Sequence, residues 1–439
     1  MATINFELSK QVDESTGKSQ ILVRVSISRS FRVGGKTGLF INPKDWDSKT
    51  MSIRKISRIE SRDKQRELED LRAQLDRLKE HLGQVIIDTK DIDSLSDKKD
   101  RQAIHRLKRE NPKARIIVTG CYAALQPQQI ASMMEVNHVI PKDLNTFHPA
   151  YSRDDRTRCF LKIQDGCNYF CTYCTIPLAR GRSRNGSIAS IVAQAKEALQ
   201  QGAKEIVLTG VNIGDFGRST NETFLDLLKS LDTLLPSSST PLPQYRIRIS
   251  SCEPNLLTDE IIDFVAKSKH FAPHFHIPLQ SGSDEMLKIM HRHYDTALFT
   301  ERIEHIRKVM PDAFIGVDCM VGVRGETEDR WNEYVNYIST LPVSQLHVFT
   351  YSERANTRML TMDLPVIPMN ERHRRSEVLH RISENKLKAF YEAHKGLSAT
   401  VLWEGKKQDG LMYGFTENYI KVSRPYDKAR VNTFETITI

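Results

Sequence analysis

The feature that most constrains this chain is a short loop with three cysteines, Cys167, Cys171 and Cys174, separated by three and then two residues. Three thiolates this close together can bind three irons of a cubane 4Fe-4S cluster and leave its fourth iron without a protein ligand. A zinc knuckle is the alternative, but zinc sites usually close with a fourth Cys or His, and the nearest histidines are His148 and His270. We therefore expect a cluster with an open metal position, as in reactive centres.

Composition and charge restrict the class of protein and its partners. The 439 residues are 39% hydrophobic and 27% charged, which is ordinary for a soluble globular chain of about two to four domains. The sequence shows no signal peptide and no apolar stretch that could span a bilayer, so we expect a cytoplasmic protein with no membrane partner. Seven cysteines, three of them in one loop, favour metal binding over disulfides. A net charge of +9 favours a polyanionic partner, nucleic acid first.

Residues 1–92 are expected to form a β unit followed by a helix. Apolar and polar residues alternate over 21–27 and 37–41, which predicts strands. Leucines recur at three- and four-residue spacing within 59–82, which predicts a helix packed on its own sheet. An acidic and polar stretch at 88–100 then indicates a domain junction.

Residues 93–150 are expected to form a truncated α/β domain. The compact apolar run 116–120 is typical of a buried parallel strand. Cys121 comes directly after this strand, where α/β sheets carry their functional groups. A helix near 127–134 and a further apolar run at 136–140 complete the unit.

From residue 158 strands and helices alternate, which predicts a parallel sheet with right-handed crossovers, closed or half-closed as a barrel, over residues 151–368. The cysteine loop follows the first of these strands, at the edge where barrel enzymes place their chemistry. The expected strands are 159–164, 205–209, 245–250, 274–279, 313–321 and 345–351. The expected helices are 188–201, 224–235, 256–267, 283–291, 299–310 and 328–341.

A basic helix and a small β domain are expected after the barrel. The helix lies within 369–396, and residues 397–439 alternate like the strands of a small β-barrel. A basic helix beside a barrel with exposed aromatic residues favours an RNA-binding platform. The alternative is a solvated helix with a purely structural β domain.

The Cx3CxxC loop at the mouth of a partial barrel resembles the hallmark motif of the radical S-adenosylmethionine (SAM) superfamily. This resemblance implies that the fourth iron binds the amino and carboxylate groups of SAM. One electron from the cluster would then cleave the sulfonium to a 5′-deoxyadenosyl radical, which can abstract hydrogen from an unactivated C–H bond.

The surrounding motifs resemble those of tRNA methylthiotransferases, in the bacterial branch that acts on N6-threonylcarbamoyladenosine at position 37. The resemblance covers residues 95–439 and implies a transferase that adds a methylthio group to C2 of this anticodon-loop adenosine. It implies a 4Fe-4S cluster and SAM as cofactors, with tRNA and a reductant such as flavodoxin or ferredoxin as partners. The implied fold is α/β, a partial parallel (βα)6 radical-SAM barrel followed by an RNA-binding TRAM barrel. The matching motifs are 159–177, 180–184, 205–214, 276–283, 316–318, 325–327 and 414–419.

The resemblance also assigns roles to individual residues. Cys167, Cys171 and Cys174 are implied to hold the radical-generating cluster, as metal ligands and as catalytic residues. A second set is implied to bind SAM, although each of its polar members could equally be an ordinary loop or strand-end residue. This set is Tyr173, Thr209, Gly210, Asn212, Ser250, Gln280, Ser281 and Asp318.

The N-terminal part departs from this family, whose members hold a second, auxiliary cluster with three cysteines. Only Cys121 matches one of those ligands. A single thiolate cannot hold a cubane cluster, so we expect one complete cluster and a second one that lacks ligands. Cys159, Cys252 and Cys319 are interpreted as buried small residues on or beside barrel strands.

Residues 1–90 resemble the arm-type DNA-binding domain of tyrosine recombinases from Bacteroides-like mobile elements. The matching residues include 17–25 and the turn 42–47. This resemblance implies DNA binding without strand cleavage, because no recombinase catalytic domain follows. The simplest explanation is a fused gene in which a mobile-element fragment replaced the first part of a methylthiotransferase.

Three functions stay open at this point. The first is a tRNA methylthiotransferase, either active or impaired by the loss of auxiliary cysteines. The second is a radical SAM enzyme without sulfur insertion, such as one that transfers a methyl group. The third is a chimeric nucleic-acid-binding protein with a vestigial enzyme domain.

Overall fold

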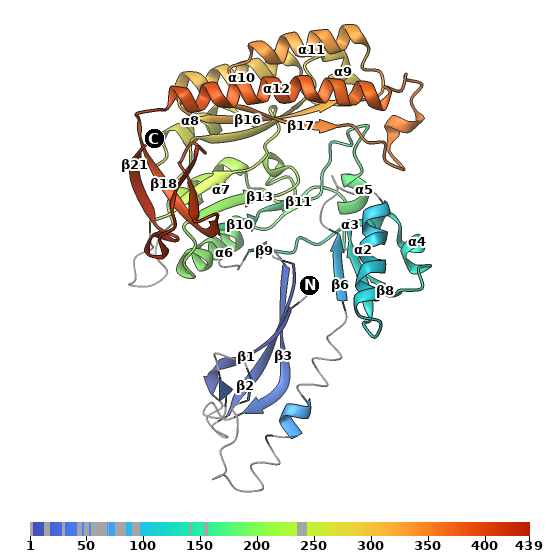
Figure 1. Cartoon of the computed structure of the whole chain (residues 1–439), viewed down its shortest axis with the longest axis vertical. Helices are drawn as coiled ribbons and strands as arrows, with labels where there is room; N and C mark the ends of the chain where they lie inside the picture. The colour runs from blue at the N-terminus through green and yellow to red at the C-terminus, as the bar shows by residue number, and fades with distance from the viewer. Residues whose placement is uncertain are drawn as a thin grey trace. The chain divides into compact units, whose positions relative to one another are not determined.

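A computed structural model describes residues 3–12, 18–28, 31–41, 46–47, 52–53, 68, 70–74, 85–89, 97–140, 143–152, 157–234 and 244–439. The chain divides into two compact units, Met1–Asp143 and Leu144–Ile439, which are described separately (Figure 1). Most of the turn expected at 42–47 and of the junction at 88–100 lies outside the described residues. Of the helix expected over 59–82, only residues 68 and 70–74 are described, and these are helical.

The first unit opens with a small β sheet, as the alternating pattern predicted. Its antiparallel strands follow one another in the sheet in the same order as in the chain. They are β1 (Thr3–Val12), β2 (Ser19–Ser28) and β3 (Phe31–Ile41), followed by the short pair β4 (Trp46–Asp47) and β5 (Ser52–Ile53).

The rest of this unit is a three-stranded parallel sheet with β7 (Ile116–Gly120) at its centre. The strands β7 and β8 (Val136–Ile140) lie where the apolar runs predicted them. A strand that the sequence did not predict, β6 (Val85–Thr89), pairs with the other side of β7. The boundary expected near residue 92 therefore falls inside this sheet unit. Its helices are α2 (Asp97–Glu110), α3 (Cys121–Leu125) and α4 (Pro127–Ala131).

The second unit contains the six parallel strands that the sequence predicted, arranged in two sheets. Two isolated parallel bridges, Ile247 to Phe271 and Ser251 to His276, connect the sheets. A short antiparallel strand, β9 (Ala150–Tyr151), lies beside the first of the six. The six are β10 (Arg158–Lys162), β13 (Glu205–Thr209), β14 (Arg246–Ile249), β15 (His274–Gln280), β16 (Phe314–Val321) and β17 (Gln345–Thr350).

Helices in the intervals cover these strands, and one large hydrophobic core joins both layers. Local chemistry explains where several helices begin, because the side chains of Ser187, Thr223 and Thr327 accept hydrogen bonds from the first turn that follows each of them. The helices are α6 (Ile188–Gln200), α7 (Phe224–Asp232), α8 (Asp259–Lys267), α9 (Asp284–Ile289), α10 (Thr296–Val309) and α11 (Glu328–Thr340).

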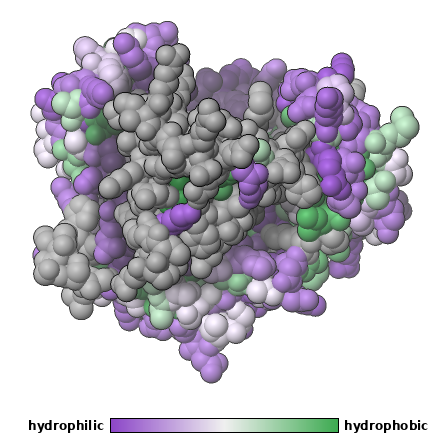
Figure 2. All heavy atoms as spheres, turned by 90° about the horizontal axis from the view of Figure 1, so that it is seen from below, coloured by the Kyte–Doolittle hydropathy of each residue, from purple (hydrophilic) through white to green (hydrophobic). Residues whose placement is uncertain are grey.

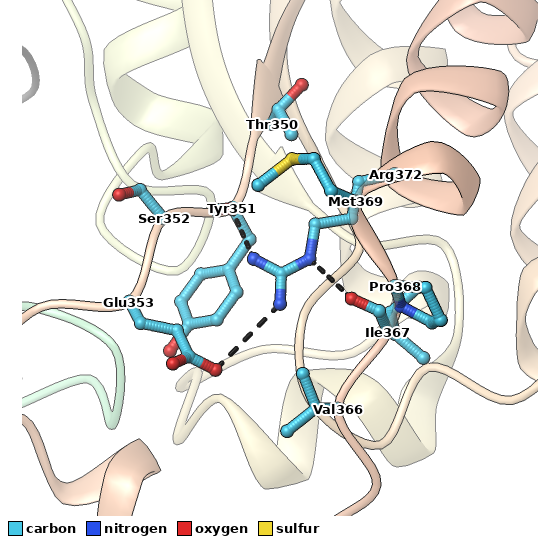
Figure 3. Close-up of a pocket in the computed structure, with 9 residues that line it drawn as sticks. All are labelled: Thr350, Tyr351, Ser352, Glu353, Val366, Ile367, Pro368, Met369 and Arg372. Carbon is cyan, nitrogen blue, oxygen red and sulfur yellow. Dashed lines mark hydrogen bonds and ion pairs between the residues drawn. The ribbon is translucent and has the colours of Figure 1, made fainter.

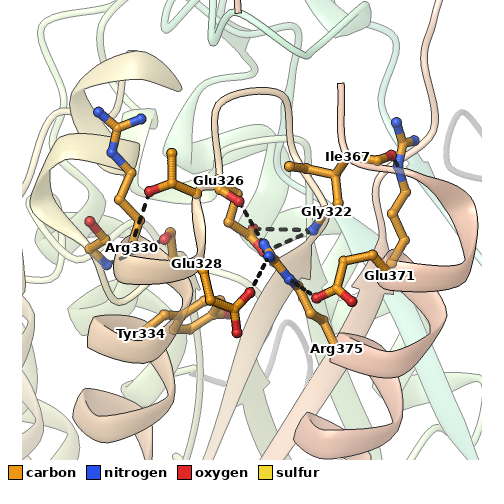
Figure 4. Close-up of polar contacts among 12 residues, drawn as sticks. Gly322, Glu326, Glu328, Arg330, Tyr334, Ile367, Glu371 and Arg375 are labelled. Atoms are coloured by element: carbon orange, nitrogen blue, oxygen red, sulfur yellow. Dashed lines mark hydrogen bonds and ion pairs between the residues drawn. The ribbon is translucent and has the colours of Figure 1, made fainter. Parts of the chain in front are cut away.

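The basic helix α12 (Met369–Ala393) is attached to the segment that follows β16 by a buried ionic network around Arg375 (Figure 4). Its guanidinium donates to the carbonyl and the carboxylate of Glu326, each at 2.7 Å, and to Glu371 at 2.7 Å. Glu326 in turn accepts from the Gly322 backbone N–H that follows β16. The basic character of α12 is thus partly structural, since this arginine faces the core.

The C-terminal residues form a four-stranded antiparallel sheet of order β20-β19-β18-β21. Val401, Trp403 and Met412 form its buried core. Its strands are β18 (Ser398–Gln408), β19 (Leu411–Phe415), β20 (Lys421–Pro425) and β21 (Phe434–Thr438).

A second buried ionic network joins this sheet to the parallel strands β13 and β14. Glu205 on β13 is fully buried and binds Arg246 at 2.6 Å and Arg248 at 3.1 Å, both on β14. Arg246 also donates to the carbonyl oxygens of Thr400 and Phe415 in the C-terminal sheet. Burial alone would raise the pKa of Glu205, but the two arginines outweigh it and lower the pKa to about 2.

Hydrophilic residues predominate among the described atoms on the face shown in Figure 2. The chain as a whole carries a net charge of +9. Within the described residues, no helix is long and apolar enough to cross a membrane.

We predict that Glu205→Gln destabilises the second unit by about 3 kcal/mol, because it leaves two buried arginines without their carboxylate. The lowered pKa means that the Glu205 contribution is present above about pH 4.5 and is lost as the pH falls toward 2. Urea unfolding at pH 7 and at pH 3 measures both effects. The exposed Glu392, paired with Lys395, is the control, and Glu392→Gln should leave the stability nearly unchanged because exposed ion pairs contribute little. Equal effects of the two substitutions would contradict the prediction.

Candidate active site

The three cysteines lie between β11 (Gln164–Asp165) and the short helix α5 (Ile176–Arg180), just beyond the end of β10. The loop has little regular structure of its own and is held by neighbouring segments. Cys167 N–H donates to the carbonyl of Gly181 at 3.1 Å, and Thr172 N–H donates to that of Met290 at 3.1 Å. The thiols are therefore fixed by contacts from two separate parts of the chain.

A buried carboxylate anchors the start of the loop. Asp165 is 1% exposed and lies 2.7 Å from Lys162, 3.4 Å from Arg180 and 3.5 Å from Arg184. It also accepts from the backbone N–H of Gly166 at 2.9 Å. Three cations around one carboxylate hold the strand end from which the cysteines project.

Gln164, also fully buried, connects the cysteine loop to the loop after the next strand. Its Oε1 accepts from the N–H groups of Val211 and Asn212, each at 2.9 Å. Its Nε2 donates to the carbonyls of Asp165 at 3.1 Å and Gly166 at 2.8 Å. One side-chain amide thus sets the position of the predicted SAM-binding segment relative to the thiols.

Each of the three sulfurs accepts a hydrogen bond. Backbone N–H groups of Tyr169 and Ile176 donate to Cys167 and Cys174 at 3.5 and 3.4 Å. The guanidinium of Arg292 donates to Cys171 at 3.1 Å.

Burial raises the pKa of the Cys167 and Cys174 thiols to about 12, so in the absence of metal these thiols are neutral, and bound iron would displace their protons. Among the residues that the structure describes, no three His, Cys, Asp or Glu side chains surround a single ion position. In a cubane cluster each cysteine binds its own iron, and three thiols on one loop suit that arrangement.

Two predicted SAM-binding residues have buried polar atoms that no described residue satisfies. The side chain of Asn212 is 3% exposed, and both its amide oxygen and its nitrogen are without a partner. Gln280 has a left-handed φ of 68° and a buried Oε1 without a partner. Because buried polar groups in proteins are nearly always hydrogen-bonded, these atoms are suited to a polar ligand such as SAM.

The other predicted SAM-binding residues either have hydrogen-bond or ionic partners within the protein or lie at the ends of strands. Tyr173 lies next to the thiols and accepts from Arg292 at 3.3 Å. Asp318 is paired with His276 at 2.6 Å, and Ser281 accepts from a neighbouring backbone N–H at 3.3 Å. Thr209 ends β13, Gly210 follows it, and Ser250 follows β14.

The sequence analysis missed the segment after α9 that packs on the cysteine loop. Besides Arg292, it includes His293, whose ring stacks on that of Tyr169 with 4.2 Å between centroids. Glu253, which follows β14, forms an ion pair with Arg292. The signal in the sequence was a run of polar and aromatic residues directly after an amphipathic helix, with no spacing that tied it to the cysteines.

A separate pocket of about 450 Å³ lies beyond the C-terminal end of β17 (Figure 3). Arg372 forms one wall and donates to the carbonyls of Tyr351 and Ile367, each at 2.8 Å. None of the predicted site residues lines this pocket. Its lining residues are Thr350, Tyr351, Ser352, Glu353, Val366, Ile367, Pro368, Met369 and Arg372.

The remaining cysteines do not form a second cluster site in the described residues. Cys121 is buried at the start of α3 and is the only cysteine of the first unit. Cys159, Cys252 and Cys319 are buried in the second unit, where burial raises the pKa of each thiol. Their burial agrees with the interpretation as small core residues.

We predict that Gly166→Ala prevents cluster assembly. Gly166 has φ +74°, and an added methyl would lie 2.0 Å from the carbonyl oxygen of Arg182. Gly202 also has a positive φ, +100°, but open space around its Cα, so Gly202→Ala carries only the backbone strain of about 1–2 kcal/mol. Iron content after anaerobic reconstitution should fall for Gly166→Ala alone. A full iron content in Gly166→Ala would contradict the prediction.

Comparison with protein families gives two matches. The Radical SAM superfamily matches residues 161–338, and the Uncharacterized protein family UPF0004 matches residues 55–141. The second match begins inside the recombinase-like range 1–90 and gives that resemblance no support.

The chain is also similar to curated proteins. It is 33% identical over 375 residues to the threonylcarbamoyladenosine tRNA methylthiotransferase MtaB of Bacillus subtilis, covering 77% of this chain and 81% of the relative. The MtaB protein of Aquifex aeolicus is 32% identical, covering 77% and 87%. A tRNA-2-methylthio-N(6)-dimethylallyladenosine synthase of Clostridium botulinum is 32% identical, covering 65% and 63%. The solved structure of the cobalamin-dependent SAM radical enzyme OxsB is 10% identical, with a TM-score of 0.45 over 88% of this chain and 66% of that chain.

Proposed function

This chain belongs to the threonylcarbamoyladenosine tRNA methylthiotransferase family of radical SAM enzymes, and we propose that it adds a methylthio group to C2 of N6-threonylcarbamoyladenosine at position 37 of tRNA. A 4Fe-4S cluster and SAM are its cofactors. Together they supply a 5′-deoxyadenosyl radical when bound. We place this reaction in the cytoplasm, where tRNA is available.

One observation carries the proposal. Gln164 links the cysteine loop to the end of the next strand, where buried polar atoms have no hydrogen-bond partner among the described residues. Cys167, Cys171 and Cys174 project from one loop, and Gln164 binds both this loop and the segment that holds Asn212. The buried, unpartnered amide of Asn212 is available to the polar end of SAM. In this role Asn212 orients the cofactor, and Gln164 positions Asn212.

The six parallel strands and the C-terminal sheet support the finer parts of the proposal. We propose that the strands form the partial (βα)6 barrel of this superfamily and that residues 397–439 form a TRAM-type RNA-binding barrel. We further propose that a flavodoxin or a ferredoxin delivers the electron to the cluster. DNA binding by the N-terminal arm rests only on the recombinase resemblance and is not needed for this function.

Exposed lysines beside half-buried tyrosine rings on the C-terminal sheet support tRNA binding. The ammonium of Lys421 lies 4.4 Å from the ring centroid of Tyr413, and that of Lys407 lies 5.4 Å from the ring of Tyr426. Both lysines are exposed. Lysines contact phosphates while aromatic rings stack on unpaired bases, so this arrangement suits a structured RNA.

Sulfur insertion is the step that separates the two candidate functions, because only Cys121 matches an auxiliary-cluster ligand. A radical SAM enzyme that cleaves SAM without inserting sulfur is the second candidate, and the single Cys121 favours it. The similarity to methylthiotransferases, which covers 77% of this chain, favours the first candidate.

The test is nucleoside mass spectrometry of tRNA from a strain that lacks its own enzyme and expresses this chain. We expect the 2-methylthio derivative of N6-threonylcarbamoyladenosine with the wild-type chain and none with Cys171→Ser. Unmodified nucleoside in both would contradict methylthiolation, and SAM cleavage by the purified protein would then identify the second candidate. Reconstituted protein should contain about four irons per chain, whereas about eight would show that a second cluster forms.

We predict that Lys421→Ala weakens tRNA binding and reduces the slope of log K against log salt by about 1. The exposed Lys308 on α10 provides a matched control, because its removal changes the total charge equally without altering the C-terminal sheet. Fluorescence anisotropy with labelled tRNA at several salt concentrations measures both slopes. Equal slopes for the two variants would contradict a tRNA contact at Lys421.

A further inference from the structure

We propose that Arg292, held in place by Glu253, sets the reduction potential of the cluster bound by Cys167, Cys171 and Cys174. This inference rests on the proposed function, because it requires a cluster at these thiols. It adds a positioning and tuning residue that neither the cysteine spacing nor the family motifs identified.

Arg292 is buried beside one of the three sulfurs. Its side chain is 4% exposed and forms an ion pair with Glu253, which is 14% exposed. One Nη donates to the sulfur of Cys171 at 3.1 Å and to the hydroxyl of Tyr173 at 3.3 Å. Nε donates to the hydroxyl of Tyr294 at 3.0 Å. All three nitrogens of the guanidinium are thus used, and one N–H points at a cluster ligand.

The backbone around Arg292 keeps this donor at a set distance from the cysteine loop. The carbonyls of Ile289 and Met290 accept from the hydroxyl and the N–H of Thr172, at 2.9 and 3.1 Å. Tyr294 donates to the carbonyls of Pro278 and Leu279 at the end of β15. The guanidinium therefore cannot move away from Cys171 without breaking contacts on both sides.

This contact differs in kind from those at the other two sulfurs. Cys167 and Cys174 accept from neutral backbone N–H groups, whereas Cys171 accepts from a cation. Hydrogen bonds from charged donors are stronger than neutral ones, and arginine keeps its charge in proteins. The charge and the N–H···S bond both act on the same ligand, so the effect of Arg292 falls on Cys171 in particular.

The direction of the effect follows from the charge change on reduction. The oxidised cluster accepts one electron from an external reductant, so the reduced cluster is more negative by one charge. A nearby cation and N–H···S bonds stabilise the more negative form and raise the potential. Glu253 opposes this effect with its own negative charge while it orients the guanidinium. Arg292 therefore raises the reduction potential and Glu253 lowers it, and substituting one residue at a time separates the two effects.

The experiment uses the full chain, anaerobically reconstituted, with the cluster titrated by dithionite and monitored by electron paramagnetic resonance. We expect Arg292→Gln to lower the midpoint potential and Glu253→Gln to raise it, each by at least tenfold in the reduction equilibrium, which is 59 mV for a one-electron couple. Arg292→Lys keeps the positive charge but loses the planar, forked guanidinium, so its midpoint potential should lie between those of the wild type and Arg292→Gln. The control is Arg302→Gln, which breaks the ion pair with Asp259 between α10 and α8 and should leave the potential unchanged.

The outcomes separate this inference from the proposed function. Wild-type protein that binds no iron would contradict the proposed function itself. A cluster of normal iron content whose potential is the same in wild type, Arg292→Gln and Glu253→Gln would overturn the inference alone. If Arg292→Gln binds too little iron to titrate, Glu253→Gln decides, because its amide oxygen can still accept from the Arg292 guanidinium while the negative charge is removed. An unchanged or lowered potential in that variant would also overturn the inference.

Discussion

The structure around the cysteines depends on hydrogen-bond partners for the backbone of a loop that has almost no secondary structure of its own. A buried loop with unpaired N–H and C=O groups is unstable, so another part of the chain must supply partners. Gln164 does this at the strand end: its amide accepts from Val211 and Asn212 and donates to Asp165 and Gly166. Glycine at 166 lets the chain turn close to Arg182, where a side chain would collide. Three thiols can then project from a fixed backbone.

Buried ionic networks hold α12 and the C-terminal sheet to the parallel strands of the second unit. Glu205 binds Arg246 and Arg248, and Arg246 reaches into the C-terminal sheet. Arg375 similarly joins α12 to Glu326 beyond β16. Buried ion pairs are poor sources of net stability but orient the partners that satisfy them. Here they fix where α12 and the C-terminal sheet stand relative to the parallel strands, which an apolar contact would define less sharply.

Much of the second unit was predictable because its signals are local. The regular alternation of strand and helix segments along the chain predicted the six strands and the helices between them, with ends shifted by a few residues. The missed features are not local. Strand β6 overlaps the junction expected at 88–100 by only its last two residues, and it was not predicted; it pairs with β7. Arg292 is separated from Cys171 by 121 positions, and no spacing rule connects two residues so far apart.

The sequence by itself determined the chemistry of the centre, because three thiols in one short loop limit what can bind there whatever surrounds them. It also determined the order of strands and helices, because the pattern of apolar and polar side chains that predicts them is a local property of the sequence. Only the tertiary structure decided which side chains meet the sulfurs and which polar atoms remain for a cofactor. Packing brings Arg292 and Glu253 to the loop and leaves the side chain of Asn212 buried without a partner among the described residues. Both results depend on which residues become neighbours in the folded chain, and the local sequence around Arg292 and Glu253 does not indicate those neighbours.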